Sequence, residues 1–244
     1  KITDTVKHIL IINVLFFAAK YVALQSGVNL TQHLGLFFIK NELFMPWQFV
    51  TTMFMHADVN HILFNMLALW MFGSALEQVW GRTKFLFFYF SAAIGAAIIY
   101  TGINYFRFNQ IYEIFINAGL TNSEVISILK AGSTNDIRVV NAITQEEFNK
   151  IGSLYNSVTV GASGALYGIF AASAVMFPNM EIRLLIFPIP LKNSYYMLTL
   201  ILSDLFLGVI SRENDNIARF AHVGGALVGG LIAWYWKQNQ FKIK

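Results

Sequence analysis

The sequence contains no cysteine among its 244 residues and few charged side chains, 12% of the total, whereas soluble domains carry about 25%. The absence of cysteine excludes a disulfide framework, a cysteine nucleophile and a thiolate-bound metal. The shortage of charge and the hydrophobic share of 56% exclude a soluble globular protein and indicate a membrane protein. The basic residues form no stripe and gather at the ends of apolar segments, so the net charge of +4 does not indicate nucleic acid. We expect the lipid bilayer as a partner, no nucleic acid, and neither a cofactor nor a metal.

Six apolar stretches meet or approach the roughly 20 residues that a helix needs to cross a bilayer. They predict an all-α membrane protein, a bundle of six transmembrane helices in which residues 1–244 form one membrane domain. The aromatic connection 26–55 carries few charges, so we expect it to lie in the membrane interface. The predicted spans are about 8–25, 60–79, 85–105, 160–177, 194–210 and 217–236.

A polar insertion, residues 107–157, separates the third predicted span from the fourth. Short helices are expected within it, for example at 111–120 and 123–130. Lysine and arginine gather at the amino terminus, at the turn 81–84, between the fourth and fifth spans (Arg183, Lys192) and at the carboxyl terminus, and such residues favour the cytoplasmic side. Both termini are therefore predicted to be cytoplasmic, with the insertion outside.

Ser163 lies between Gly161 and Gly164, at the head of the fourth predicted span. Small neighbours allow a carbonyl carbon to reach the serine Oγ, and they leave backbone N–H groups open as donors to an oxyanion. In soluble hydrolases such a serine joins a strand to a helix, whereas here an apolar stretch follows it. Tyr167 follows one helical turn later. The pattern indicates a serine nucleophile in a membrane helix.

Imidazole and amide groups lie in two other spans, where polar residues are costly and usually functional. His61 and Asn65 open the second span on one helical face, with His56 just before them, and His222 lies early in the sixth span. Spans two, four and six all run inward in the predicted topology. These residues and Ser163 therefore lie at a similar depth below the outer surface, which predicts an acyl-transfer site.

Small residues at four-residue spacing mark one face of the fourth span and one face of the sixth. Such faces let helix backbones approach closely. We predict that the two faces pack together and bring Oγ of Ser163 within the roughly 2.6–3.2 Å of His222 that a nucleophile and its base require. The small residues are Gly164 and Gly168 in the fourth span and Ala221, Gly225 and Gly229 in the sixth.

Other readings of these polar residues stay open. Each of them taken alone also fits a packing role. Asp204 in the fifth span could orient a base or form a structural hydrogen bond, and we favour the structural bond. A transporter with a proton relay through His61, Asp204 and His222 predicts ion flux that survives Ser163→Ala, and a catalytically inactive binding module would be expected to lack Ser163 or His222. Lys20, in the first span, is expected to snorkel.

The chain resembles the rhomboid intramembrane serine proteases in three stretches that occur in the family's order. The sequence HADVNHILFN at 56–65 is similar to the family's His-x-x-x-Asn signature, GASGALY at 161–167 to Gly-x-Ser, and AHVGGALVG at 221–229 to Ala-His-x-x-Gly-x-x-x-Gly. The likeness extends to nearly all of the chain outside the insertion. It includes the shorter stretches 46–47, 187–190 and 203–206.

The resemblance implies an intramembrane serine endopeptidase that cleaves transmembrane proteins near the outer membrane boundary through an acyl-enzyme. It implies Ser163 as the nucleophile and His222 as its base, a dyad without a carboxylate, with Tyr167 stacked on the His222 ring. His61, Asn65 and the backbone N–H of Ser163 would form the oxyanion hole. His56, Gly161, Gly164 and Gly225 would support the site.

Two departures from the family pattern stand out. Gln48 follows Trp47, where the family often has arginine, and the insertion is longer than the usual connection. Six predicted spans without a seventh, and no organelle-targeting segment, predict a bacterial plasma membrane location.

Overall fold

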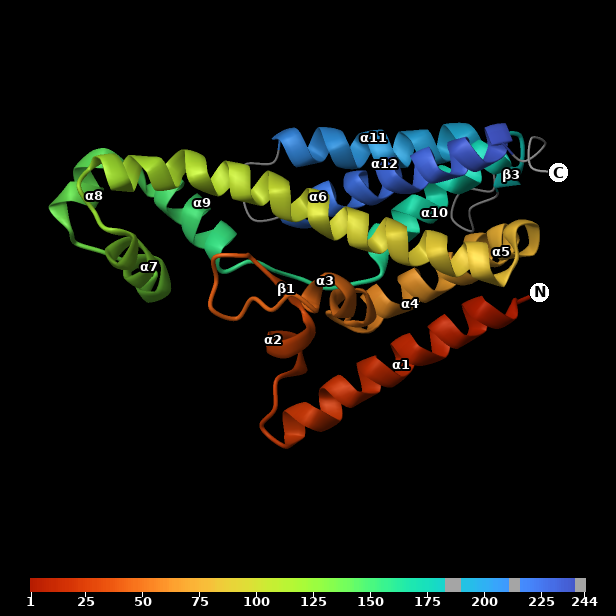
Figure 1. The fold of residues 1–244 in the computed structure, drawn as a ribbon, viewed down its shortest axis with the longest axis horizontal. Helices are drawn as coiled ribbons and strands as arrows, with labels where there is room; N and C mark the ends of the chain where they lie inside the picture. Colours follow the sequence, from red (N-terminus) through yellow and green to blue (C-terminus); the bar gives the residue numbers. More distant parts are fainter. Residues whose placement is uncertain (183–189, 211–215, 240–244) are drawn as a thin grey trace.

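The computed structural model describes residues 1–182, 190–210 and 216–239. Long helices run side by side through the molecule, and a group of shorter helices lies beyond one end of the bundle (Figure 1). The predicted turn 187–190, except Pro190, and the basic residue Arg183 lie outside the described residues.

A helix occupies each of the six predicted spans, so the all-helical class is confirmed. In the described ranges three helical stretches are long and apolar enough to cross a membrane, at Asp4–Gln25, Val59–Trp80 and Arg82–Asn117, while the apolar Ser163–Met176 is shorter. The count of six spans stays a prediction. The helices are α1 (Asp4–Gln25), α4 (Val59–Ala68) continued by the π-helical η2 (Leu69–Gly73) and α5 (Ser74–Trp80), α6 (Arg82–Asn117), α10 (Ser163–Met176), α11 (Asn193–Ile210) and α12 (Asn216–Asn239).

The start of α1 and the end of α12 lie at the same end of the bundle (Figure 1). The N–H of Val6, at the start of α1, donates to the Glu77 carboxylate of α5 at 3.0 Å. At the same end, the ring centroids of Trp80 and Trp236 lie 5.0 Å apart and join α5 to α12. The start of α1 and the end of α12 therefore face the same side.

The bundle core lies where α6, α10 and the second helical stretch meet. Large aromatic and aliphatic side chains from different helices are buried there against one another, and in a bilayer this close packing supplies the attraction between the helices. Fully buried members of this core include Leu69, Leu76, Phe85, Phe88, Tyr89 and Ile169.

The first loop is held by its own short elements, α2 (Leu30–Leu34), β1 (Leu36–Phe37), α3 (Gln48–Thr51) and the 3-10 turn η1 (Thr52–Phe54). The Gln48 side chain, completely buried, donates from Nε2 to the Leu43 carbonyl at 2.8 Å and accepts from the Phe37 N–H at 3.2 Å. Glutamine thus organises the loop at the position where the resemblance led us to expect arginine.

Two short antiparallel ladders accompany the helices. β1 pairs with β2 (Val158–Thr159), with Leu36 opposite Thr159, and β3 (Glu181–Ile182) pairs with β4 (Leu191–Lys192). The first ladder connects the first loop to the segment that leads into α10.

The glycine faces of α10 and α12 pack directly against each other, as predicted. A Cβ on Gly225 would lie 1.9 Å from the backbone oxygen of Gly164, and a Cβ on Gly229 would lie 2.4 Å from Cα of Gly168. These separations are far below van der Waals contact. Only hydrogen atoms at these positions allow the two backbones to lie so close.

We predict that Gly225→Ala destabilises the protein by about 2–3 kcal/mol or more, because its methyl group overlaps a backbone atom that cannot move away alone. Gly230→Ala is the matched control on the same helix, since its Cβ would lie 3.5 Å from the Ala171 Cβ, an ordinary contact. Thermal unfolding in detergent measures both variants. Equal melting temperatures for the two would contradict the packing.

The insertion begins as a direct continuation of α6. This helix has 36 residues and is about 54 Å long, whereas the hydrocarbon core of a bilayer is about 30 Å thick. The predicted span 85–105 lies within this helix, whereas the expected separate short helix at 111–120 was wrong, because apolar residues continue along the inner face of α6 to Phe115. The expected helix at 123–130 is confirmed as part of α7 (Asn122–Ala131).

The insertion has a hydrophobic core of its own. Helices α7, α8 (Ile137–Ala142) and α9 (Gln145–Tyr155) pack on the extended end of α6 (Figure 1). This core recruits Phe38 from the first loop, and its other buried residues include Phe108, Ile111, Phe115, Val125, Leu129, Val139, Ile151, Leu154 and Tyr155. The polar insertion is therefore a small packed helical unit.

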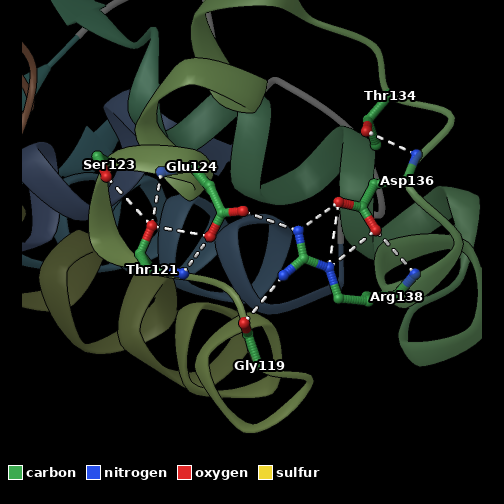
Figure 2. A network of polar contacts seen from close by, with 7 residues as sticks. All are labelled: Gly119, Thr121, Ser123, Glu124, Thr134, Asp136 and Arg138. Atoms are coloured by element: carbon green, nitrogen blue, oxygen red, sulfur yellow. Dashed lines mark hydrogen bonds and ion pairs between the residues drawn. The ribbon is translucent and has the colours of Figure 1, made fainter.

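Polar contacts fix the start of α7 to the loop before α8 (Figure 2). The Thr121 side chain accepts from the Glu124 N–H, and Glu124 accepts in return from the Thr121 N–H, which forms a capping box. Arg138 donates to Glu124 at 2.8 Å, to Asp136 at 2.7 Å and to the Gly119 carbonyl at 3.0 Å. One guanidinium thus joins three segments of the insertion.

The insertion is also fastened to the first loop. The Lys40 ammonium lies 4.2 Å from the Tyr112 ring centroid, and the Asn41 amide donates to the Tyr155 carbonyl at 2.9 Å. Lys130 forms an ion pair with Glu42. The first loop therefore rests on a folded support outside the bundle.

We predict that acid loosens this unit through Glu124. The Arg138 guanidinium, with help from the Thr121 N–H and hydroxyl, lowers the pKa of Glu124 from 4.5 to about 2. A lowered pKa in the folded state means that this contribution to stability is present above about pH 4.5 and is lost as the pH falls toward 2. Pepsin cleavage between residues 122 and 155 should therefore accelerate across this window.

The variant Glu124→Gln should be cleaved faster than wild type at pH 4.5 and should converge with it near pH 2, while Glu113→Gln, outside this network, should follow wild type. A wild-type advantage over Glu124→Gln that persists unchanged to pH 2 would contradict the assignment.

Candidate active site

Ser163 is the first residue of α10 and follows a sharp bend in the chain. Gly161 has φ of 125°, a conformation that side-chain-bearing residues rarely adopt, and its N–H donates to the Thr52 carbonyl at 3.0 Å. A Cβ on Gly161 would lie 2.7 Å from Nε2 of His61. The bend therefore places the backbone before Ser163 directly against α4, a contact that only glycine permits.

The structure brings Ser163 and His222 together. Oγ of Ser163 lies 2.9 Å from Nε2 of His222, within the predicted range. The Tyr167 ring stacks on the His222 ring, with centroids 4.2 Å apart and planes 8° from parallel. The contacts of Gly164 and Gly225 place the two helices at the distance that this geometry needs.

His61 and Asn65, both in α4, lie beside the bend at Gly161. Asp58 caps α4 by accepting from the His61 N–H at 2.9 Å, which fixes the first turn of the helix. Asn65 is buried, and its Nδ2 has no acceptor among the described residues. Its Nδ2 lies 3.6 Å from the position of a Cβ on Gly161. An amide donor without an acceptor thus lies beside the backbone that leads to Ser163.

His56 lies behind His61, and the ring centroids are 5.1 Å apart. It is 1% exposed, and neither ring nitrogen has a hydrogen-bond partner within the described ranges. Lys20 of α1 donates to the carbonyls of His56 and Ala57 at 2.9 and 2.7 Å. Lys20, predicted to snorkel, thus holds the chain that enters α4.

Asp204 differs from its expected role. Its Oδ2 lies 2.7 Å from Nδ1 of His222, and its Oδ1 accepts from Arg219 at 3.0 Å. We expected a dyad without a carboxylate and a merely structural bond for Asp204, whereas the structure places it directly on the imidazole. Arg219 was missed altogether, although its position three residues before His222 puts it on the same face of α12.

The arrangement offers a hydroxyl, an imidazole that could take its proton, and amide and imidazole donors nearby, which suits acyl transfer. Among residues 1–182, 190–210 and 216–239, no three histidine, aspartate or glutamate side chains lie close enough to hold a metal ion.

The fold and the site define a helical membrane protein with a serine–histidine pair between two of its helices. The family model of the rhomboid domain matches residues 43–239, and the chain belongs to the rhomboid family. This span includes every site residue described above except Lys20.

Curated relatives come from bacteria and from organelles. The chain is 28% identical over 194 residues to the rhomboid protease AarA of Providencia stuartii, which covers 77% of this chain and 54% of the relative. It is 24% identical over 182 residues to the mitochondrial Rhomboid protein 1 of Saccharomyces cerevisiae, covering 75% and 39%. It is 25% identical over 196 residues to the putative rhomboid protease YdcA of Bacillus subtilis, covering 80% and 69%. The chain thus spans about half or less of the length of the first two relatives.

Proposed function

We propose that the chain is an intramembrane serine endopeptidase in which Ser163 is the nucleophile and His222 its general base. The observation that carries this proposal is the 2.9 Å separation between Oγ of Ser163 and Nε2 of His222, with Tyr167 stacked on the imidazole. A serine is a weak nucleophile until an adjacent base takes its proton. Of the three relatives described above, one is named a rhomboid protease and another a putative rhomboid protease, which agrees with this chemistry.

In the proposed reaction Oγ of Ser163 attacks a substrate carbonyl while its proton passes to Nε2 of His222. The tetrahedral oxyanion accepts hydrogen bonds from Asn65, His61 and the backbone N–H of Ser163, which as the first N–H of α10 has no intrahelical partner. The buried, unpaired Nδ2 of Asn65 supports this role, since such a donor is costly unless a ligand satisfies it. His222 then protonates the leaving amine, and water hydrolyses the acyl-enzyme.

The proposed substrates are transmembrane proteins cut near the outer boundary of the bilayer. Within a helix each peptide carbonyl is engaged in the i→i−4 hydrogen bond. The scissile bond must therefore unwind before Ser163 reaches it, and small or helix-breaking residues lower the cost of that step.

We predict that a transmembrane reporter with glycine beside the scissile bond is cut faster than one with leucine there. Ser163→Ala should abolish cleavage of both, a loss of at least about 10⁴-fold, with the melting temperature unchanged. Ser203→Ala, which removes an exposed hydroxyl on α11, is the matched serine control and should cleave normally. Cleavage by Ser163→Ala at the wild-type rate would refute the proposed nucleophile.

We further propose that the protein lies in a bacterial plasma membrane, with both termini in the cytoplasm and the insertion outside. The shared end of the bundle for the start of α1 and the end of α12 supports one side for both. Basic residues in the first turn of α6, Arg82 and Lys84, favour the cytoplasm for that end.

The absence of cysteine makes this topology directly measurable, because each single-cysteine variant carries one thiol. We predict that Ser133→Cys, in the loop between α7 and α8, reacts with a membrane-impermeant maleimide in intact cells. Thr83→Cys, in the first turn of α6, should react only after permeabilisation. The opposite pattern would invert the topology.

A further inference from the structure

The carboxylate of Asp204 lies at the far side of the His222 ring from Ser163. Its Oδ2 is 2.7 Å from Nδ1, while Nε2 of the same ring lies 2.9 Å from Oγ of Ser163. Asp204 is 9% exposed and comes from α11, whereas the other two residues come from α12 and α10. Three helices thus place a hydroxyl, an imidazole and a carboxylate in one line of hydrogen bonds.

This contact selects one form of the imidazole. An ionised carboxylate only accepts hydrogen bonds, so Nδ1 of His222 must be the donor to Asp204. In the neutral ring the lone pair is then on Nε2, the atom that faces the hydroxyl of Ser163. Only this tautomer can take the serine proton. The carboxylate therefore holds the base in its reactive form.

Arg219 fixes the orientation of the carboxylate. It binds Oδ1 at 3.0 Å, on the oxygen that His222 does not use. Both carboxylate oxygens therefore have defined donors, and the Asp204–Arg219 pair carries no net charge into the helix bundle, which limits the cost of burying it.

We propose that Asp204 is a positioning residue of the catalytic site, which sets the tautomer of His222 and stabilises the imidazolium that forms when Ser163 attacks. This inference rests on the proposed function and completes it, turning a serine–histidine pair into a relay that ends in a carboxylate. A charge of opposite sign next to the imidazolium acts more strongly in the poorly polarisable interior of a membrane protein than it would in water.

The variant Asp204→Asn is expected to reverse the tautomer of His222 through its changed hydrogen bonds. Arginine only donates, so the Asn oxygen must face Arg219, and the amide Nδ2 then faces Nδ1 of His222 as a donor. The ring proton moves to Nε2, which can no longer accept from Ser163. We expect kcat on a transmembrane reporter to fall at least about 100-fold, with KM within about twofold of wild type.

A purely structural bond between α11 and α12 predicts a different result. It predicts that Asp204→Asn lowers the melting temperature while kcat of the folded protein stays near wild type. That outcome would overturn the inference. Ser203→Ala, the neighbouring residue on α11, is the control and should leave kcat and KM unchanged.

A second measurement does not depend on whether Asp204→Asn folds. Nitrogen-15 NMR of labelled histidine in the wild-type protein reports which ring nitrogen of His222 carries the proton, with His222→Gln identifying its signals among the five histidines. We expect the neutral ring to carry its proton on Nδ1. A proton on Nε2 would overturn the inference even if Asp204→Asn does not fold.

Labelling with a fluorophosphonate separates this inference from the proposed function. Labelling that depends on Ser163 but proceeds at the wild-type rate in Asp204→Asn would reject the role of Asp204 alone. Equal labelling of wild type and Ser163→Ala would reject the nucleophile and with it the proposed function.

Discussion

The close approach of α10 and α12 is the constraint on which the site depends. Ser163 and His222 belong to different helices, and only the missing side chains at Gly168, Gly225 and Gly229 let these backbones come near enough for a 2.9 Å contact. In a bilayer no hydrophobic force drives helices together, so close packing of small residues has to supply the attraction. The same glycines therefore stabilise the bundle and set the reacting distance.

Some polar groups of the site have hydrogen-bond partners whereas one buried donor has none, and this contrast fits a reaction centre. The His222 ring is held on both nitrogens and stacked on Tyr167. The Asn65 amide, by contrast, is buried without an acceptor within the described residues. A rigid base beside an unsatisfied donor is the arrangement expected where negative charge develops only during the reaction. Lys20 and the Asp58 cap add rigidity at the start of α4.

The folded insertion gives the site a second support outside the bundle. Its helices pack on the extension of α6, and its exit strand pairs with the first loop directly before the bend at Gly161. Lys40 and Asn41 bind the first loop to the same unit. The two segments that border Ser163 and the oxyanion donors are thus anchored to one small core.

Much of this could be predicted from the sequence, because the relevant signals are local. Four-residue spacings placed His61 with Asn65 and Ser163 with Tyr167 on single helix faces, and small-residue spacing indicated which faces meet. The contact between Asp204 and His222 could not be predicted, since it depends on the relative depth of two helices whose connection carries no such signal. The insertion was predicted to be polar because the polar and charged residues on its helix surfaces outnumber the few residues of its core.

Helix packing brings His222 to Ser163, and we propose that the imidazole of His222 makes the hydroxyl of Ser163 a nucleophile. Peptide mass spectrometry after fluorophosphonate treatment tests this claim most directly. The account predicts one adduct, on the peptide that contains Ser163, in the wild-type protein and a greatly reduced yield in His222→Ala. An adduct on another serine, or an equal yield at Ser163 without the imidazole, would contradict it.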